Sequence, residues 1–226
     1  MKKIEIIVIA LISLFLLTGC VDKTSDAYEF KTEYESINNK DNGHGKKYRK
    51  LNISNDNPFV YSTIEDILDK VNNKETFIVY FGFKECPWCR SIIEELIHAA
   101  KDNKVDKIYY VDVLNIRDVK EVDDNGNITT TKEGNSAYME LIEKFSNVLS
   151  DYNLNDTYMG EKRIYAPNII AVSNGEAIQM EEGISEELTD PYSKLTEKMK
   201  KYTYNKFKCL FKCLEEASTT CKKDMC

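Results

Sequence analysis

"FGFKECPWCRSIIEEL", residues 81–96, contains two cysteines that are separated by two residues. The run "TFIVYFGF" at 76–83 is continuously apolar and aromatic, which is typical of a strand covered on both faces. After the pair, Ile93 and Ile97 follow Cys89 at helical spacing. The cysteines are therefore expected where a buried strand meets the first turn of an amphipathic helix. Cysteines at such a place serve as metal ligands, as a structural cross-link or as a reactive pair.

The segments around this stretch predict an alternation of helices and strands. Their patterns predict a strand around 48–53, a helix over 62–71 capped by Ser62 or Thr63, a strand over 107–114, a helix over 137–149, two strands over 168–180 joined by Asn174-Gly175, and a helix over 190–202 that begins with Asp190 and Pro191. Such an alternation indicates an α/β fold in which helices flank a sheet.

This order of elements resembles the thioredoxin family over roughly residues 60–203. Two motifs carry the resemblance: CPWC at 86–89, which opens a helix after a buried strand, and APN at 166–168, which runs into the predicted hairpin. The resemblance implies a thioredoxin-like α/β fold with a central mixed sheet flanked by helices. The chain would add an insertion over 115–163, before a cis-proline segment, and a Cys-rich helical C-terminal tail.

The position of the pair assigns different roles to its members. A thiol attacks a disulfide only as the thiolate, and the unpaired N–H groups of a helix N-terminus stabilise that anion. Cys86 is therefore expected to be the attacking sulfur and to be partly exposed. Cys89, nearly one turn later and facing inward, is expected to resolve the mixed disulfide. Pro87 suits the first turn, and Trp88 is expected to cover the pair or to contact the substrate.

The second motif is expected to shape the same site. By resemblance, the Ala166–Pro167 peptide bond would be cis and Pro167 would pack against Cys86. Because proline has no N–H, the neighbouring backbone would stay free to pair with an extended substrate peptide.

Residues near the pair depart from the best-known members of the family. Glu85 stands where a tryptophan often precedes the first cysteine, and Tyr80 stands where a buried carboxylate often lies. Lys84 would favour a thiolate and Glu85 would oppose it, so the direction of electron transfer stays open. The proton of Cys89 must leave through water or through another group.

The N-terminal residues resemble a bacterial lipoprotein signal. Lys2 and Lys3 precede an apolar run over 6–17, and LTGC at 17–20 closes the segment. The run is shorter than the about 20 residues that a helix needs to span a bilayer. In such signals the cysteine is lipidated and becomes the mature N-terminus. Cys20 is therefore expected to anchor the protein on the extracytoplasmic face of the cell membrane.

These patterns divide the chain into four segments. They are a signal peptide over 1–19, a polar lipid-anchored linker over 20–47, a thioredoxin-like domain over 48–203 and a Cys-rich extension over 204–226. The net charge of −7 argues against nucleic acid as a partner. The expected partners are protein thiols and disulfides outside the membrane, with a transmembrane thiol-electron carrier as a further candidate. No cofactor is expected.

Metal sites are the main alternative for two of the motifs. A zinc site at Cys86 and Cys89 would need two more ligands, and neither histidine of the chain has a second ligand placed beside it. The run "EVDDNGNITTTK" at 121–132 is similar to a calcium loop, but Lys132 stands where the loop requires a bidentate Glu. We expect no metal at either place, and a surface hairpin over 121–132.

The tail "CLFKCLEEASTTCKKDMC", residues 209–226, carries four further cysteines. An even number of cysteines in an oxidising compartment indicates disulfides. If the chain reverses within the tail, nested pairing joins Cys213 to Cys221 and Cys209 to Cys226 in a stapled helical hairpin. A zinc site built from the four thiolates is the main alternative, and electron exchange with the CPWC pair is another.

The sequence therefore predicts a membrane-anchored, extracytoplasmic thiol–disulfide oxidoreductase that acts on exported proteins. Whether it reduces, oxidises or isomerises them stays open. With "FGFKECPWCRS" and "KRIYAPNII", it also looks like the thioredoxin-like bacteriocin transport accessory proteins of Gram-positive bacteria. The alternative function is a non-catalytic binding lipoprotein in which Cys86 and Cys89 form a fixed disulfide.

Overall fold

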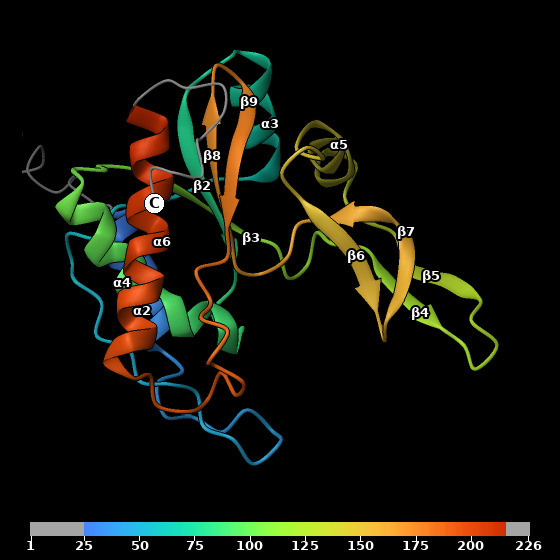
Figure 1. The fold of residues 1–226 in the computed structure, drawn as a ribbon, viewed down its shortest axis with the longest axis horizontal. Helices are drawn as coiled ribbons and strands as arrows, with labels where there is room; N and C mark the ends of the chain where they lie inside the picture. The colour runs from blue at the N-terminus through green and yellow to red at the C-terminus, as the bar shows by residue number, and fades with distance from the viewer. Residues whose placement is uncertain (1–24, 216–226) are drawn as a thin grey trace, which may run out of the picture.

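A five-stranded mixed sheet is the central element of the described chain (Figure 1). The computed structural model describes residues 25–215, so the predicted signal peptide, Cys20, Cys221 and Cys226 lie outside the described residues. In sheet order, the strands are β1 (Phe59–Tyr61), β3 (Ile108–Asp112), β2 (Phe77–Gly82), β8 (Asn168–Ser173) and β9 (Glu176–Glu181). β1, β3 and β2 are parallel, whereas β8 is antiparallel to β2 and β9. An α/β fold with a mixed sheet is confirmed.

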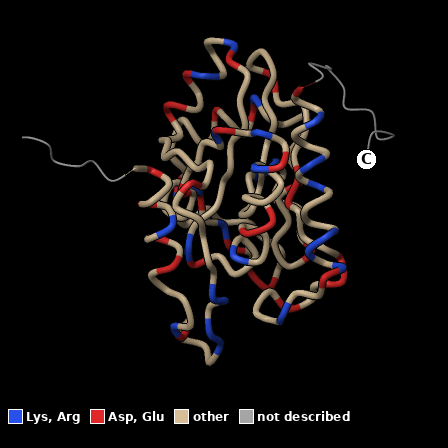
Figure 2. Tube along the Cα trace, turned by 90° about the vertical axis from the view of Figure 1, so that its left-hand side faces the viewer, with Lys and Arg blue, Asp and Glu red and all other residues tan. Residues whose placement is uncertain are grey.

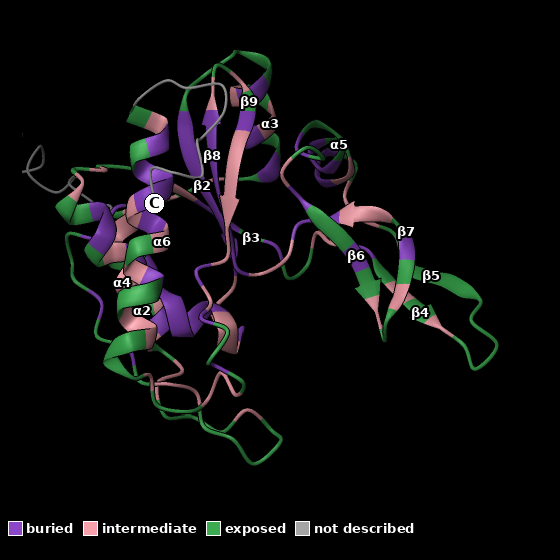
Figure 3. Cartoon of the chain, in the orientation of Figure 1, coloured by how far each residue is buried: buried purple, intermediate pink, exposed green. Residues whose placement is uncertain are grey.

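Every residue of β2 is buried because the strand lies between two hydrophobic clusters (Figure 3). Ile78 and Tyr80 belong to the first cluster, and Phe77, Val79 and Phe81 belong to the second. Alternate side chains of a strand point to opposite faces, so both faces need apolar residues. The prediction of a strand covered on both faces is confirmed.

Helices cover both faces of this sheet. Those that contribute to the cluster of Tyr80 are α2 (Asp26–Glu35), α4 (Pro87–Asp102) and α6 (Glu197–Glu215). Those that contribute to the cluster of Val79 are α3 (Ile64–Asn72) and α5 (Ser136–Lys144). Thr63 caps α3 as predicted, in a capping box with Asp66.

Residues 115–163 form an extra segment between the two sequence motifs. Besides α5 it contains the strands β4 (Val119–Val122), β5 (Ile128–Lys132), β6 (Ser150–Leu154) and β7 (Thr157–Arg163). They pair as two hairpins beside the central sheet (Figure 1). Arg163, at the end of β7, links the two hairpins of this segment. Its guanidinium donates to the buried Asp118, just before β4, at 2.6 Å and lies over the ring of Tyr152 in β6. The hairpin predicted at 121–132 is confirmed as β4 and β5.

The polar linker predicted over 20–47 is wrong from Ser25 onward. This part contains α2, capped by Ser25, and its residues Phe30 and Tyr34 are fully buried. Phe30 stacks on Phe59 of β1, with ring centroids 3.9 Å apart. Only these two inward residues, four positions apart, mark the buried face of α2, so the segment has almost no amphipathic pattern of its own.

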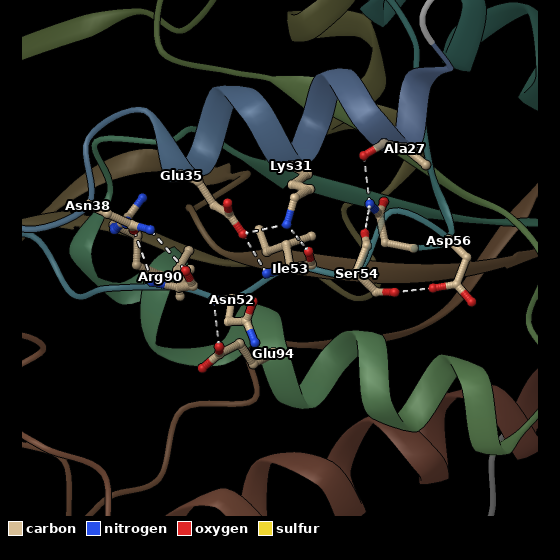
Figure 4. A network of polar contacts seen from close by, with 12 residues as sticks. Ala27, Lys31, Glu35, Asn38, Asn52, Ile53, Ser54, Asp56, Arg90 and Glu94 are labelled. Carbon is tan, nitrogen blue, oxygen red and sulfur yellow. Dashed lines mark hydrogen bonds and ion pairs between the residues drawn. The ribbon is translucent and has the colours of Figure 1, made fainter.

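The strand predicted around 48–53 does not form, although Leu51 and Ile53 are buried. Their backbone groups bond to side chains of the α2 region instead of to a neighbouring strand. Asn38 exchanges two hydrogen bonds with Leu51, and the N–H of Ile53 donates to Glu35 at 2.7 Å (Figure 4). The first strand is β1, further along the chain.

The final helix begins at Glu197 and not at Asp190 as predicted. Asp190 closes a turn by accepting a hydrogen bond from the N–H of Tyr192. Thr196 caps the helix, because its hydroxyl oxygen accepts from the N–H of Met199 at 3.2 Å.

α6 also crosses the predicted boundary between a domain that ends at residue 203 and a separate tail. It packs along α4, and its buried apolar residues, Phe207, Leu210 and Phe211, all lie beyond residue 203. Cys209 and Cys213 lie on its buried face and are disulfide-bonded. Since Cys221 and Cys226 lie outside the described residues, the nested pairing stays a prediction.

Candidate active site

Cys86 is the N-cap of α4, at the end of the turn that follows β2. Its Sγ accepts a hydrogen bond from the backbone N–H of Cys89 at 3.0 Å. An N-cap usually offers an oxygen of Ser, Thr, Asp or Asn to these N–H groups, so the sulfur takes the place of that oxygen. Pro87 lies in the first turn, where its missing N–H leaves no hydrogen bond unmade.

Cys86 is more buried than predicted, with only 3% of its surface exposed. The expected partial exposure is therefore wrong. The cause is a segment 80 residues later in the chain, where the carbonyl oxygen of Ala166 accepts a hydrogen bond from the Cys86 thiol at 3.3 Å. The spacing of the CPWC motif alone carries no information about this cover.

The surroundings of Cys86 lower its pKa below that of an ordinary thiol. Burial acts most strongly and in the opposite direction, but hydrogen bonds to the sulfur outweigh it. They come from the thiol of Cys89 and from the backbone N–H groups of Cys89 and Trp88, and the charge of Arg117 in the extra segment adds to them. Cys86 is therefore suited to act as a thiolate.

Cys89 has the opposite environment. It is fully buried in the first cluster, and this burial raises its pKa well above that of an ordinary thiol. The adjacent Cys86 raises the pKa further, whereas a hydrogen bond with the hydroxyl of Tyr80 lowers it in part. At neutral pH, Cys86 is the thiol that ionises first and Cys89 is the one that keeps its proton.

The second sequence motif lies against the first. The Ala166–Pro167 peptide bond is cis, as predicted. The side chain of Asn168, fully buried at the start of β8, accepts a hydrogen bond from the N–H of Tyr165 at 2.7 Å and holds the turn. Because β8 pairs with β2, this turn lies beside the N-terminus of α4, where Ala166 contacts Cys86.

Trp88 lies between the two cysteines in the sequence and packs, partly buried, against the first cluster. It is the only tryptophan of the chain. Its fluorescence therefore reports on this site without interference from other tryptophans.

Arg90 is a residue of this region that the sequence analysis missed. It is 1% exposed, and its guanidinium donates to the carbonyl oxygens of Tyr34 at 2.8 Å and of Lys84 at 3.3 Å. Further hydrogen bonds reach residues 38 and 49 (Figure 4). Arg90 therefore ties the end of α2 to the turn that leads to Cys86. Its place on the apolar face of the helical pattern was the signal that could have revealed it.

The charged residues before the motif act on each other. The Nζ atom of Lys84 lies 3.7 Å from a carboxylate oxygen of Glu85, so their opposite effects on Cys86 largely offset. Over the rest of the described chain, basic and acidic residues are intermixed (Figure 2). Local hydrogen bonds therefore affect the pKa of Cys86 more than the charge of the surrounding surface does.

Over residues 25–215, no group of three or more His, Cys, Asp or Glu side chains could hold a metal ion. In the same range, no helix is both long enough and apolar enough to cross a membrane. No protein-family model matches the chain, and no curated protein matches it. Function therefore has to follow from the chemistry of the site itself.

Proposed function

We propose that the protein is a thiol–disulfide oxidoreductase with a thioredoxin-like fold, in which Cys86 and Cys89 react. The observation that supports this most strongly is the contrast between the two thiols, one with a lowered pKa at a helix N-cap and one with a raised pKa in the core. A structural disulfide needs no such contrast. The strand order β1-β3-β2-β8-β9 and the cis Ala166–Pro167 bond beside Cys86 support the thioredoxin-like fold.

In the reducing direction, the Cys86 thiolate attacks one sulfur of a substrate disulfide. The substrate disulfide breaks, one substrate thiolate leaves, and a Cys86–substrate disulfide forms. The Cys89 thiolate then attacks the sulfur of Cys86, the second substrate thiolate leaves, and a Cys86–Cys89 disulfide remains. Two electrons pass to the substrate, and the same steps in reverse oxidise a substrate dithiol.

The substrate peptide is proposed to bind along the backbone at Ala166. In the free protein its carbonyl oxygen accepts a hydrogen bond from the Cys86 thiol. A thiolate cannot donate that bond, so ionisation of Cys86 frees the carbonyl oxygen for an N–H of an extended substrate. Pro167 has no N–H that would compete for the same contacts.

We place this activity outside the cell membrane, with a lipid on Cys20 as anchor. The proposed partners are exported proteins with thiols or disulfides, and a membrane carrier of thiol electrons would restore the pair. The lipoprotein-like signal at 1–20 supports this location.

The burial of Cys86, at 3% exposure, favours a second candidate function. In a non-catalytic binding lipoprotein, similar to a bacteriocin transport accessory protein, Cys86 and Cys89 would form a fixed disulfide. Such a protein would hold a partner without exchanging disulfides with it.

Cysteine variants separate the two functions. The purified protein and its variants Cys86→Ser and Cys89→Ser are mixed with a peptide disulfide, and adducts are measured by mass spectrometry. If the protein is an oxidoreductase, the reduced native form cleaves the peptide disulfide and ends with a Cys86–Cys89 disulfide. Cys86→Ser is then inert, and Cys89→Ser accumulates a mixed disulfide because only the inner thiol can release it. Absence of any adduct in all three proteins would support the binding function.

A further inference from the structure

Arg117 lies at the start of the extra segment, between β3 and β4. Its guanidinium carbon is 5.3 Å from the centre of the Phe83 ring, over the aromatic face. The carbonyl oxygen of Phe83 accepts a hydrogen bond from the N–H of Cys86 at 3.1 Å. Although burial opposes the shift, the charge of Arg117 adds to the hydrogen bonds that lower the pKa of Cys86. Arg117 is therefore linked through Phe83 to the turn that carries the proposed nucleophile.

The backbone on both sides of Arg117 is anchored in the extra segment. The carbonyl oxygen of Ile116 accepts a hydrogen bond at 2.8 Å from the N–H of Asn135, the N-cap of α5. On the other side, the buried Asp118 accepts from the guanidinium of Arg163 at 2.6 Å. Because both of its neighbours are anchored, Arg117 is presented at a defined place beside Phe83.

Arg117 differs in its contacts from the other three arginines of the chain. Arg49, Arg90 and Arg163 each donate to carbonyl or carboxylate oxygens of the protein. Within residues 25–215, the half-buried Arg117 makes neither a hydrogen bond nor an ion pair. Stacking on an aromatic face leaves the edge of a guanidinium open, and this edge carries N–H donors in a fork that matches a carboxylate. Arg117 is therefore available to bind an anion.

The nearby carboxylates of the protein have partners of their own. Glu85 pairs with Lys84, with a distance of 3.7 Å between the charged atoms. Asp112, at the end of β3, accepts a hydrogen bond from the N–H of Leu114 at 2.8 Å and closes the turn there. The anion for Arg117 is therefore expected to come from a bound molecule.

The order of the strands places Arg117 on the β3 side of Cys86 and Ala166 on its β8 side. β2 lies between β3 and β8, and the ends of β2 and β3 meet the start of β8 at one edge of the sheet (Figure 1). The N–H of Val113 donates to the carbonyl oxygen of Gly82 at 3.2 Å and continues the pairing of β3 with β2 beyond the strand. A peptide that binds at Ala166 and crosses Cys86 therefore runs towards Arg117.

We propose that Arg117 binds a carboxylate of the substrate, so that the protein prefers disulfides in which an acidic residue lies close to the cysteine in the sequence. The inference deepens the oxidoreductase function proposed above and rests on it. The guanidinium holds the carboxylate in a bidentate pair beside the Phe83 ring, while the substrate backbone binds at Ala166. The carboxylate takes no part in the disulfide exchange at Cys86 and Cys89. It fixes the position of the substrate sulfur and thereby sets the specificity.

A panel of peptide disulfides measures this preference. Each substrate is a disulfide-linked dimer of one short peptide with a single cysteine. A glutamate is moved through the three positions before and the three positions after the cysteine, and a matched peptide carries glutamine at the same place. The full-length protein, in a Cys20→Ser background and reduced at the CPWC pair, is mixed with each peptide in mild detergent. Samples are quenched with acid, and chromatography gives the rate at which the peptide disulfide is cleaved.

The variants separate the charge of Arg117 from its shape. Arg117→Met removes the charge and keeps an apolar side chain on the Phe83 ring, whereas Arg117→Lys keeps the charge and loses the fork. Lys107→Met is the matched control, because Lys107 is an exposed cation just before β3, at the opposite end of that strand. Cys86→Ser corrects for reaction at any other thiol.

We expect the native protein to cleave at least one glutamate peptide about threefold or more faster than its glutamine partner, within the range of a partly exposed ion pair. In Arg117→Met the ratio of the two rates should fall to about one, and in Arg117→Lys it should fall in part. Lys107→Met should keep the native ratio. The preference should also shrink as the salt concentration rises.

The ratio distinguishes substrate binding from an effect on the nucleophile alone. If Arg117 only lowered the pKa of Cys86, Arg117→Met would slow both peptides equally and leave the ratio unchanged, which would overturn the proposal. A ratio of about one at every position in the native protein would also overturn it, and so would an equal loss of preference in Lys107→Met. In each of these cases the peptides are still cleaved and the oxidoreductase function stands. If the native protein cleaves neither kind of peptide, the proposed function itself is contradicted.

Discussion

Hydrogen bonds to one sulfur atom lower the pKa of Cys86 in spite of its burial. Among those that lower its pKa, the bond from the Cys89 thiol is the strongest, ahead of the backbone N–H groups of α4. The pKa of Cys86 therefore depends on the protonated state of Cys89. In the proposed mechanism, this coupling lets the first step proceed with Cys89 neutral, and it disappears once Cys86 is bonded to a substrate.

The pH dependence of alkylation tests this coupling. The alkylation rate of Cys86 follows its thiolate fraction, so a lowered pKa places the midpoint below the about 8.5 of an ordinary thiol. Cys89→Ala removes the donor and should move the midpoint up, whereas Cys89→Ser keeps an O–H donor and should move it less. The rate is measured with iodoacetamide over a pH series, in a Cys20→Ser background. A midpoint at or above that of an ordinary thiol in the native protein would contradict the assignment of Cys86 as nucleophile.

Among the elements, α2 is the largest difference between the predicted and the observed N-terminal region. Phe30 and Tyr34 are fully buried among Phe59 and Tyr110, and Arg90 ties the end of the helix to α4. We expect Phe30→Ala to lower the free energy of unfolding by about 3 to 5 kcal/mol, as for other buried aromatic residues.

The matched control for this variant is Tyr28→Ala on the same helix, because Tyr28 is 46% exposed. It should change the free energy of unfolding by less than about 0.5 kcal/mol. Both are measured by urea denaturation. A small effect of Phe30→Ala, similar to that of Tyr28→Ala, would mean that α2 is not part of the folded core.

The extra segment depends on a buried ion pair. The side chains of Arg163 and Asp118 are 8% and 3% exposed, and Arg163 donates to one carboxylate oxygen of Asp118 while the other has no hydrogen-bond partner. Asp118→Ala leaves the buried guanidinium without a carboxylate, although its hydrogen bond to the backbone carbonyl of residue 118 remains, and we expect a cost of about 3 kcal/mol of unfolding free energy. Asp151→Ala breaks the exposed pair with Lys162 and should cost less than about 1 kcal/mol. Equal costs in urea denaturation would show that the Asp118 pair does not hold the segment together.

Elements with a strong local pattern could be predicted from the sequence. β2 is continuously apolar, α3 carries its own capping box, and Asn174-Gly175 supplies the positive φ angles that the turn between β8 and β9 needs. α2 and β1 could not, because each is stabilised by residues far away in the chain. β1 has only three residues and is defined by its pairing with β3.

At the scale of the whole molecule, the site is assembled from segments that no local pattern joins. The roles proposed for Cys86 and Cys89 come from their spacing, but the cover of Cys86 by Ala166 depends on the pairing of β2 with β8. The hydroxyl of Tyr34 could not be placed beside Tyr80, because α2 itself was not predicted. Sequence spacing thus predicts which two thiols have different environments and misses what surrounds them.

The most direct test of the central claim is the reduction potential of the Cys86–Cys89 pair. The purified protein is equilibrated with redox buffers of known potential, and the fluorescence of Trp88, the only tryptophan, reports the fraction oxidised. The account predicts a reversible two-electron transition with a midpoint between about −120 and −270 mV, the range of exchanging dithiols. A pair that stays oxidised to below about −300 mV, as structural disulfides do, would contradict it.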